Sequence, residues 1–457
     1  MADGSNGDPS GRTERSSGAK RRALANEGRL AALGDAVDRQ SGKVPKRRRR
    51  RRRGRTWLIA GVAVIVLIGG VLGGGYLYAN WRFDEIPKIN VKNISYPVPG
   101  QPFNILAIGS DSRAGLTGAV ARQTGASSGS VSGQRSDVIK IIHINPTAGT
   151  ITILSIPRDT AVTLLANQSL FGKFNRINVN YQNGPSLLVQ TIEANFGIPI
   201  NHVIQVNFSG LINSAVAIGG VYLDFRYPAR DPYSGLKITH TGCQLVDGFQ
   251  ALAVARSRHY YYAPSGNPPW PSDAMSIINA GGTPAGWVYD GTSDFGRIDR
   301  QTSFLRAMFS RVKSKLDDPF AINGFLSNLP KGITLDSTFS LNEIIGLALK
   351  FHGYNSGSML TYTLPEVPGV VNGADLEFVD QPYAQQMLVN IFGNTLKTVT
   401  NPPPNTALQT PPPPVITPTT TTTGPATTSK HHHVPTTTTT NPTLALPIFD
   451  PVPCTPG

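Results

Sequence analysis

The chain has 457 residues, 39% of them hydrophobic and 15% charged, and its formal net charge is +14. Residues 1–55 hold 17 Lys and Arg against 6 Asp and Glu, whereas the rest of the chain holds 25 against 22. Because the positive excess belongs to one terminal segment, the composition argues against a nucleic-acid-binding face spread over a folded domain.

An uncharged apolar segment follows this basic segment. Residues 1–55 are rich in Gly, Ser, Ala and charge, and are predicted to be a disordered cytoplasmic tail. From Trp57 to Tyr78 no residue is charged, and a helix of that length crosses ~30 Å of hydrocarbon. We therefore predict a transmembrane helix over residues 56–80, which is too long for a secretory signal peptide. The preceding arginines predict a single-pass protein of the cytoplasmic membrane, with its N-terminus in the cytoplasm and residues 82–457 outside.

The basic run before the apolar segment has two interpretations. Lys46 and the arginines up to Arg55 would contact either anionic lipid head groups or a nucleic acid. We favour the lipid, because the charge of a membrane surface is sufficient to explain a polybasic segment beside it. We therefore expect no nucleic-acid partner.

Residues 81–98 are predicted to be a linker, and residues 99–397 an extracytoplasmic globular domain. Short apolar runs bounded by turn-forming residues predict strands, and longer runs with helical apolar spacing predict helices. The predicted strands cover residues 103–109, 137–145, 150–157, 202–208 and 221–225; the predicted helices cover residues 185–197, 209–220, 245–259, 296–316, 340–351 and 380–392. This alternation predicts an α/β/α sandwich, in which helices cover both faces of a mixed central sheet.

The C-terminal segment, residues 398–457, is composed mainly of Pro and Thr and is predicted to be a disordered tail. The two cysteines of the chain are Cys243 in the globular domain and Cys454 near the C-terminus. Both lie on the side predicted to be exported, where thiols are oxidised. We favour a disulfide between them over two free thiols.

Charged residues stand at the ends of the first three predicted strands. Asp111 follows the first strand, Arg135 and Asp137 begin the second, and Arg158 and Asp159 follow the third. If the second and third strands form a hairpin, Asp137 and Arg158 come close together, and Asp111 joins them if the first strand is parallel to the third. Any one of these arginine–aspartate clusters alone would more often be a surface salt bridge. The prediction of a shared site therefore depends on finding such clusters at several strand and helix ends.

Further arginines recur at helix ends later in the chain. They are Arg256 and Arg258, with His259, in one motif, and Arg297 and Arg300, with Asp294 and Gln301, in another. Arg297 and Gln301 lie on one helical face because they are four residues apart, whereas Arg300 points another way. Arginine binds phosphate oxygens in pairs, and Mg²⁺ prefers one or two carboxylates together with substrate phosphates. The whole set therefore predicts a magnesium-assisted phosphoryl site.

Several motifs of the globular domain resemble those of the LytR-CpsA-Psr family. In order they are NILAIGSDSR, RSDVIKIIHINPTAGTITILSIPRDT, RINVNY, AIGGV, GCQLVDGFQALAVARSRH and DFGRIDRQ, and the likeness covers roughly residues 100–365. Members of the family are membrane-anchored enzymes outside the cell that transfer a glycan phosphate from a polyprenyl pyrophosphate carrier to peptidoglycan, using Mg²⁺. The resemblance implies an α/β/α fold with a long apolar pocket for the prenyl chain.

The resemblance also implies roles for individual residues. Asp111 and Asp137 are expected to hold Mg²⁺, with Mn²⁺ as the alternative ion. The residues expected around the pyrophosphate are Arg135, Arg158, Arg256, Arg258, Arg297 and Gln301, and we count Arg176 and Arg300 with the substrate-binding residues. The partners implied are a polyprenyl-pyrophosphate-linked glycan, peptidoglycan and the cytoplasmic membrane.

Two features depart from the family pattern. Arg176 stands where the family usually has a lysine before Ile-Asn, which keeps the charge and changes the geometry. Residues 260–293 form a long insert with six aromatic residues, Tyr260, Tyr261, Tyr262, Trp270, Trp287 and Tyr289. These rings would either stack on sugar rings or pack the insert onto the domain, and the sequence favours neither.

For the reaction, we expect arginines such as Arg158 and Arg297 to neutralise the charge that develops on the leaving prenyl phosphate. A carboxylate, Asp159 or Asp294, would accept the proton of the attacking sugar hydroxyl. The alternative, which we rate higher for each, is that the aspartate orients an arginine.

Three functions from different classes remain open. The first is a glycopolymer phosphotransferase, whose glycan would be arabinogalactan because the Pro/Thr tail suggests an actinobacterial envelope. The second is a polyprenyl-pyrophosphate hydrolase that uses the same residues with water as acceptor. The third is a membrane-bound regulator with a nucleic-acid-binding tail, which is disfavoured because the predicted site lies across the membrane from that tail.

Overall fold

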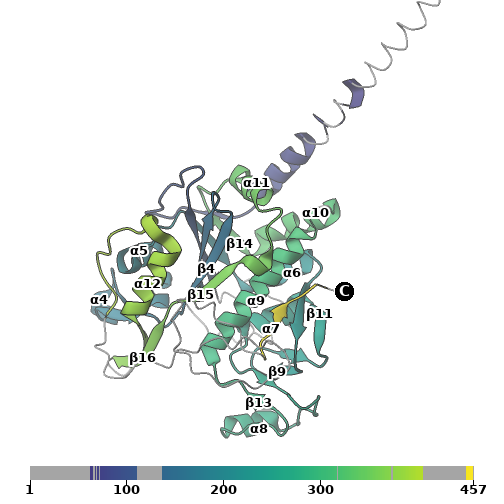
Figure 1. Ribbon diagram of the computed structural model, residues 1–457, viewed down its shortest axis with the longest axis vertical. Coiled ribbons are helices and arrows are strands. Elements are labelled where there is room, and N and C mark those ends of the chain that lie inside the picture. Colours follow the sequence, from purple (N-terminus) through teal and green to yellow (C-terminus); the bar gives the residue numbers. More distant parts are fainter. Residues whose placement is uncertain are drawn as a thin grey trace, which may run out of the picture. The chain divides into compact units, whose positions relative to one another are not determined.

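A computed structural model describes residues 62–64, 67, 69–70, 73–110, 136–315, 318–371, 374–404 and 449–455 (Figure 1). The chain divides into two compact units, residues 1–78 and 79–457. The predicted cytoplasmic tail and 11 of the 25 residues of the predicted transmembrane segment lie outside the described residues. Within the described ranges, no helix has both the length and the apolar character that crossing a membrane requires.

A seven-stranded mixed sheet forms the centre of the second unit, in the order β1-β14-β7-β2-β3-β4-β15. In chain order its strands are β1 (Lys88–Ile89), β2 (Phe103–Ser110), β3 (Ser136–Asn145), β4 (Thr150–Ile156), β7 (His202–Val206), β14 (Ile333–Asp336) and β15 (Leu360–Thr363). Strand β3 is antiparallel to both β2 and β4, so β2 and β4 run in the same direction. The predicted mixed sheet and the predicted hairpin of residues 137–145 and 150–157, now β3 and β4, are confirmed.

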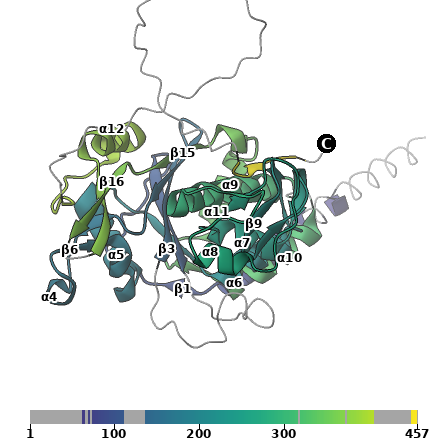
Figure 2. The same ribbon diagram turned by 90° about the horizontal axis from the view of Figure 1, so that it is seen from below.

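Helices cover both faces of this sheet (Figure 2). On one face, Leu106, Ile141 and Leu154 pack against α5 (Pro185–Phe196) and α12 (Gln381–Phe392). On the other face, Ile105, Ile144 and Ile153 pack with α11 (Leu341–Lys350) and with Phe309 of α9 (Ser293–Lys313). The alternation of sides along each strand is the two-residue period of an extended chain. The predicted sandwich of helices around the sheet is confirmed.

A second layer of small sheets lies beyond the helices of that second face. Helices α6 (Phe208–Ala217), α7 (Gly248–Arg256) and α9 share a core with β8 (Val221–Phe225) and β11 (Gly242–Val246). The remaining small strands of this layer are β9 (Ala229–Asp231), β10 (Leu236–Ile238), β12 (Tyr261–Tyr262) and β13 (Val288–Tyr289). Residues 221–225 were predicted as a strand, and they belong to this layer rather than to the central sheet.

Other elements complete the unit. They are β5 (Ala161–Thr163), α4 (Gln168–Phe171), β6 (Phe174–Arg176), the 3-10 helices at Ile177–Asn183, Leu329–Lys331, Ser356–Ser358 and Gly393–Thr395, α8 (Ala274–Asn279), α10 (Pro319–Asn328), β16 (Glu366–Val371), β17 (Ala374–Val379) and β18 (Val452–Pro453). Strands β16 and β17 form a hairpin, and Glu377 of β17 bridges to Thr160 beside the end of β4.

Residues 81–98 are not a linker as predicted. Their strand β1 pairs with β14 at the edge of the central sheet. Phe83, Ile86 and Val91 are buried in the hydrophobic cores. These apolar side chains gain hydrophobic stabilisation from burial, and they extend the domain toward the N-terminus.

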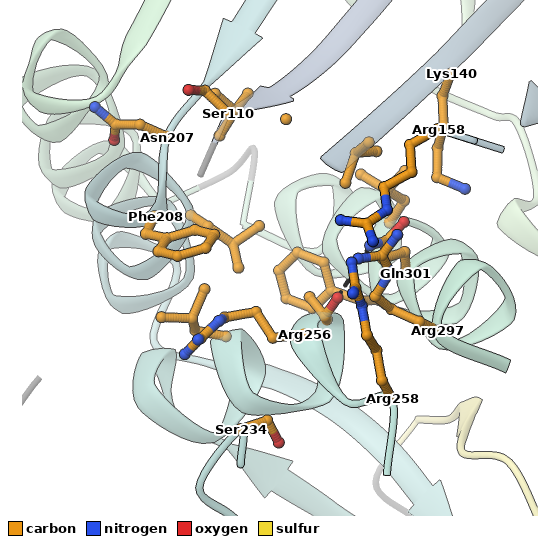
Figure 3. A pocket seen from close by; sticks show the side chains of 18 of the residues that line it. Ser110, Lys140, Arg158, Asn207, Phe208, Ser234, Arg256, Arg258, Arg297 and Gln301 are labelled. Carbon is orange, nitrogen blue, oxygen red and sulfur yellow. Dashed lines mark hydrogen bonds between the residues drawn. The ribbon is translucent and has the colours of Figure 1, made fainter. Parts of the chain in front are cut away.

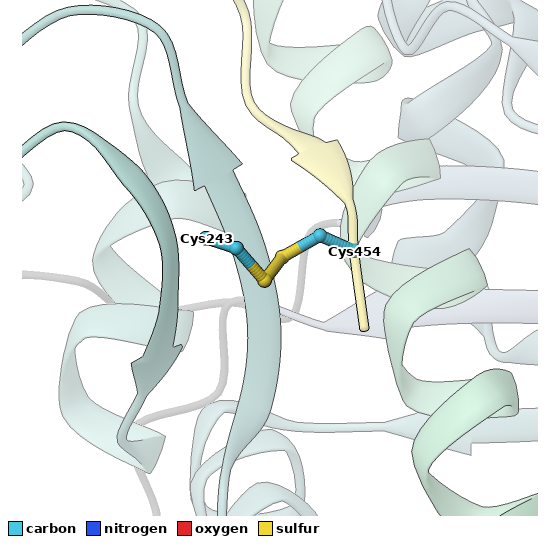
Figure 4. Close-up of a disulfide and its surroundings, with 2 residues drawn as sticks. All are labelled: Cys243 and Cys454. Carbon is cyan, nitrogen blue, oxygen red and sulfur yellow. A yellow bond between two sulfur atoms is a disulfide. The ribbon is translucent and has the colours of Figure 1, made fainter. Parts of the chain in front are cut away.

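The end of the C-terminal tail also packs on the domain. Strand β18 pairs with β8, and Cys454 forms a disulfide with Cys243 of β11, 211 residues earlier (Figure 4). The disulfide favoured from the sequence is thus present in the structure. Residues 405–448, the bulk of the predicted tail, lie outside the described residues.

A close approach of two glycines fixes α6 against the start of β14. A Cβ atom on Gly210 would overlap the carbonyl oxygen of Gly332, and one on Gly332 would overlap the amide nitrogen of Gly210. We expect Gly210→Ala to lower the free energy of unfolding by about 1–3 kcal/mol, because backbone atoms must move apart. Denaturant titration of the full-length chain measures the change.

Gly346 provides the matched control, since it also lies within a helix, α11, and a Cβ atom there meets no heavy atom within 4 Å. Gly346→Ala should raise stability by about 0.5–1 kcal/mol through reduced backbone entropy of the unfolded chain. Equal effects of the two substitutions would contradict the proposed backbone contact.

Candidate active site

A cavity of about 400 Å³ opens between the ends of β2, β3 and β4 and the helices α6, α7 and α9. Its wall is largely apolar, with Ile108, Val138, Leu211, Leu252 and Phe304 among the lining residues. Its polar lining includes Arg158, Arg256, Arg258, Arg297 and Gln301. Figure 3 shows Arg158, Arg258, Arg297 and Gln301 grouped on one side, with Arg256 and Phe208 on the other. An apolar hollow with one cationic side fits an amphiphilic anion.

Different elements bring these arginines together. Arg158 follows Pro157, where β4 leaves the sheet. Arg256 is the last residue of α7, and Arg258 lies two residues beyond it in the loop that follows. Arg297 and Gln301 occupy successive turns of α9, as their spacing predicts. The Gln301 side chain donates to the Ala255 carbonyl at 3.0 Å, which ties α9 to the end of α7.

Arg158, Arg258 and Arg297 share one carboxylate, that of Asp294. Its oxygens lie 3.2 Å from Arg158 Nε, 2.8 Å from Arg258 Nε and 3.3 Å from Arg297 Nη2. Arg297 is almost fully buried, whereas the other side chains of this group are about a quarter exposed. We call Arg158, Arg258 and Arg297 the arginine cluster. Three guanidinium groups that converge on one carboxylate beside a cavity offer the charged donors that suit an anionic ligand.

Asp159 and Arg176 lie beside the arginine cluster. Asp159 contacts Arg158 Nε and Arg176 Nε, both at 3.3 Å. Arg176 also donates to the Asp375 carbonyl of the β16–β17 hairpin. Arg176 therefore joins the cluster through Asp159 and is not among the residues that line the cavity. Both predicted proton acceptors, Asp159 and Asp294, are paired with arginines, as carboxylates that orient arginines would be.

Two further carboxyl groups lie near Asp159. Burial raises the pKa of Glu366 well above its ordinary value, although its hydrogen bond from the Thr160 hydroxyl opposes the shift. Burial also raises the pKa of Glu377, and the charge of Asp159 adds to the effect. The raised pKa values shift both carboxyl groups toward their protonated, uncharged forms. Glu366 and Glu377 therefore add less negative charge beside the arginine cluster than two ionised carboxylates would.

A buried carboxylate, Asp231 at the end of β9, organises the loop that carries Arg258. Its Oδ2 accepts from Ser257 Oγ at 2.7 Å and from the amides of Arg258 and His259 at 3.0 Å. Its Oδ1 accepts from the amides of Tyr233 and Ser234. Our sequence interpretation missed this residue. The signal was an Asp followed by Pro at a turn, which favours hydrogen bonding of the side chain to nearby amides.

Lys140 of β3, also missed, lines the cavity beside Arg158. Its ammonium donates to Ser155 Oγ at 2.6 Å and to Thr302 Oγ1 at 3.0 Å. Burial lowers its pKa to about 7, and the charge of Asp299 only partly opposes the shift. A lone lysine inside an apolar strand was the signal that could have identified it.

The lowered pKa of Lys140 predicts a pH-dependent stability. Since the unfolded chain binds this proton up to pH about 10.5 and the folded chain only up to about 7, the charged lysine destabilises the fold most below pH 7. Lys140→Met should therefore raise stability at pH 7 relative to wild type, and the gain should shrink by about 1.4 kcal/mol per pH unit toward pH 10. Denaturant titrations at pH 7, 8 and 9 measure it.

Lys237→Met, at an exposed position, is the control for Lys140→Met and should show no such trend. A gain that is constant with pH would mean that Lys140 stays protonated in the folded protein.

Arg300 does not line the cavity, although we counted it with the substrate-binding residues. Its side chain is fully buried between Asp290 and Asp450, at 2.8 and 2.6 Å. It also donates to the Ser257 carbonyl at 3.0 Å. Arg300 thus lies apart from the cavity, and its pair with Asp450 joins α9 to the C-terminal segment.

Of the two residues predicted to bind the metal, the structure places only the backbone of Asp137. Asp111 and Arg135 lie outside the described residues, and for Asp137 only its place in β3 is described. Strand pairing sets Ser110 opposite Ser136, the residue before Asp137. Among the side chains that the structure describes, no group of three or more His, Cys, Asp or Glu is arranged to hold a metal ion.

Comparison with known proteins identifies the family. The sequence profile of the LytR_cpsA_psr family matches residues 83–265 and 288–392. The chain belongs to the LytR-CpsA-Psr family. The matched ranges include the arginine cluster and Asp294, and they leave out residues 266–287.

Two curated relatives and one solved structure illustrate the likeness. "Probable cell wall biosynthesis protein LcpB" of Corynebacterium glutamicum is 29% identical over 305 residues, 65% of this chain and 64% of that protein. "Polyisoprenyl-teichoic acid--peptidoglycan teichoic acid transferase TagV" of Bacillus subtilis is 28% identical over 273 residues, 57% of this chain and 58% of that protein. The chain thus spans less than two thirds of these relatives' length. The "LytR-Csp2A-Psr enzyme from Actinomyces oris" is 20% identical with a TM-score of 0.49, over 69% of this chain and 97% of that one.

Proposed function

We propose that this LytR-CpsA-Psr protein is a phosphotransferase that moves a glycan phosphate from a polyprenyl pyrophosphate carrier onto peptidoglycan. The observation that carries the proposal is the arginine cluster around Asp294, at one side of an apolar cavity. The guanidinium groups suit the oxygens of a diphosphate, and the apolar wall suits the first part of a prenyl chain.

The names of the relatives support the same class of reaction. TagV is named a transferase of polyisoprenyl-linked teichoic acid to peptidoglycan, and LcpB a cell wall biosynthesis protein. For this chain we propose a cell-wall glycan as the transferred group. Arabinogalactan as that glycan rests on the composition of residues 398–457 alone.

In the proposed reaction, a hydroxyl oxygen of peptidoglycan forms a bond to the phosphorus that carries the glycan. The bond from that phosphorus to the bridging oxygen breaks, and the electron pair leaves with the prenyl phosphate. Arg158, Arg258 and Arg297 stabilise the charge that develops there, in a site where their positions are already fixed. The hydroxyl proton passes to a base, for which Asp159 and Asp294 are the carboxylates at hand.

We further propose that Asp111 and Asp137 hold a Mg²⁺ or Mn²⁺ ion, which would neutralise phosphate charge when bound. The choice of residues supports this, because Mg²⁺ is held in proteins by one or two carboxylates together with substrate phosphates, and Asp137 of β3 directly precedes Val138, which lines the cavity. Chelation by EDTA should then abolish transfer, and added Mg²⁺ should restore it.

We also propose that the protein is anchored in the cytoplasmic membrane by residues 56–80, with its catalytic domain outside. The Cys243–Cys454 disulfide supports an oxidising environment for that domain. A reporter enzyme that works only outside the cytoplasm should be active when fused after residue 400 and inactive when fused at residue 40. The reverse pattern would overturn the proposed orientation.

The activity itself is tested with the full-length chain in detergent micelles. The substrate is a synthetic polyprenyl-pyrophosphate-linked oligosaccharide, offered with and without peptidoglycan fragments. Product that contains both the glycan and the peptidoglycan fragment supports transfer. Glycan phosphate released equally with and without the acceptor would assign the site to the hydrolase alternative.

A further inference from the structure

The segment that the family profile leaves out, residues 266–287, folds as an addition to the small strands β12 and β13. Trp287 is 4% exposed and packs with Tyr261, and Trp270 meets it edge to face at 5.0 Å between ring centroids. Tyr260 is fully buried as well. These rings therefore pack the insert onto the domain, which is one of the two roles that the sequence left open for the aromatic residues.

Other aromatic rings of the same region remain at the surface. Tyr233 is 44% exposed and Tyr289 is 37% exposed, although both are large side chains with apolar faces. His259 lies between them, with its ring centroid 4.4 Å from Tyr233 and 6.4 Å from Tyr289. We call Tyr233, His259 and Tyr289 the aromatic ledge. It is a continuous row of three rings.

The insert supports the ledge from behind. Tyr289 belongs to β13, directly after the insert, and β13 pairs with β12. Its ring lies 5.2 Å from Tyr261, which in turn packs against Trp270 of the insert. The hydroxyl of Tyr233 donates to Asn279 Oδ1 of α8 at 3.1 Å. The added segment thus fixes the side chains of Tyr289 and Tyr233. It thereby reduces the conformational entropy that they would lose on binding a ligand.

The ledge begins at the cavity. Tyr233 and His259 line the cavity, and His259 follows Arg258, whose Nε lies 2.8 Å from Asp294. Because Arg258 and His259 are adjacent in the chain, a sugar attached to a phosphate on the arginine cluster would lie next to the first ring of the ledge. Continuity with the proposed phosphate site, rather than exposure alone, is what indicates a ligand.

The chemistry of the ledge suits an uncharged sugar chain. Sugar rings present an apolar C–H face, which an aromatic face covers, and a hydroxyl edge that needs hydrogen bonds. The tyrosine hydroxyls, the imidazole and the Asn279 amide supply polar atoms along the same row. The nearest acids are occupied, since Asp231 accepts hydrogen bonds from its own loop and Asp290 pairs with Arg300.

We propose that the aromatic ledge binds consecutive neutral sugar rings, and that the inserted segment 266–287 provides this saccharide subsite. The proposal rests on the proposed function, of which it names the part that holds the glycan. Exposed aromatics also occur where proteins meet a bilayer, so a membrane contact is the competing occupant.

Calorimetric titration of the full-length chain in detergent micelles tests the ledge without turnover. The probes are an N-acetylglucosamine tetramer, a soluble arabinogalactan fragment and inorganic pyrophosphate. Tyr289→Ala should weaken saccharide binding about 2–10-fold, the value of one aromatic contact, and should leave pyrophosphate binding unchanged. Tyr289→Phe keeps the ring and should bind saccharide nearly as wild type does. Tyr383→Ala, at a tyrosine of α12 that is 50% exposed, is the matched control and should have no effect.

The proposal is overturned if neither saccharide binds the wild-type chain, or if Tyr289→Ala binds both as tightly as wild type. It is also overturned if a photoreactive phenylalanine at position 289 crosslinks to lipid in nanodiscs and not to added saccharide. Failure of the proposed function is a separate result. It would appear as absent transfer by a wild-type chain that still binds saccharide through Tyr289.

Discussion

Arg158→Ala is expected to lower the rate of glycan-phosphate transfer about 10²–10³-fold, and Arg297→Ala to do the same. Each change removes one charge-assisted donor from the leaving phosphate, a loss of about 2.7–4 kcal/mol by analogy with an oxyanion donor. The folded state should change little for Arg158, whose side chain is 22% exposed. Transfer rates at saturating substrate, with circular dichroism of each variant, measure both effects. Arg258→Ala, in the same cluster, should follow the same pattern.

Two comparisons separate catalysis from general loss of charge. Arg158→Lys keeps the charge and loses the planar fork, so it should recover only part of the rate. Arg311→Ala removes an arginine from the far end of α9, where it donates to the Ile218 carbonyl, and should leave the rate nearly unchanged. If Arg158→Ala and Arg297→Ala stay folded and keep near-normal rates, these arginines are only ion-pair partners of Asp294 and the proposed site is wrong.

Arg300→Met is expected to destabilise the fold strongly, by about 3–5 kcal/mol, because it leaves the buried carboxylates of Asp290 and Asp450 without their cation. Burial raises the pKa of Asp450 to about 6, and Arg300 is the group that restrains this rise. Without Arg300 the pKa of Asp450 rises further, so the penalty for its ionised form extends to higher pH. The deficit should therefore be larger at pH 8 than at pH 5, where protonation relieves it.

Arg306→Met is the matched control on the same helix. Arg306 is partly buried and donates to the Met359 carbonyl and to Thr361 Oγ1, and within the described part of the chain it pairs with no carboxylate. Its loss should cost less, and the cost should be the same at pH 5 and pH 8. A deficit for Arg300→Met that does not change with pH would contradict the proposed charge balance. Denaturant titration at both pH values decides between these outcomes.

Local sequence patterns were sufficient to predict much of the site. Turn residues between two apolar runs predicted the β3–β4 hairpin, and pairing in one sheet then brings Arg158 to the edge where β2 ends. The spacing of Arg297 and Gln301 predicted their shared face on α9, which lies against the cavity. These inferences succeeded because the periods of helices and strands are properties of the local chain.

The features that sequence reasoning missed depend on contacts between distant segments. Arg300 has a structural role because it forms an ion pair with Asp450, which is 150 residues away in the sequence. Asp231 organises the Arg258 loop from a different small sheet, and residues 81–98 complete the central sheet by pairing with β14. No local period encodes such partners. The sequence could show that these residues are charged or apolar, but the position of their partners comes only from the fold.

The attachment of the C-terminal segment changes what a protease could achieve. Before residue 405 the chain is held to the domain, since the Thr163 hydroxyl donates to the Pro402 carbonyl and the amides of Thr400 and Asn401 donate to Ala194. After residue 448 it is held by β18 and by the disulfide to Cys243. A single cut between these points would therefore release nothing: both fragments would migrate as one species until the disulfide is reduced, and Asp450 would stay beside Arg300.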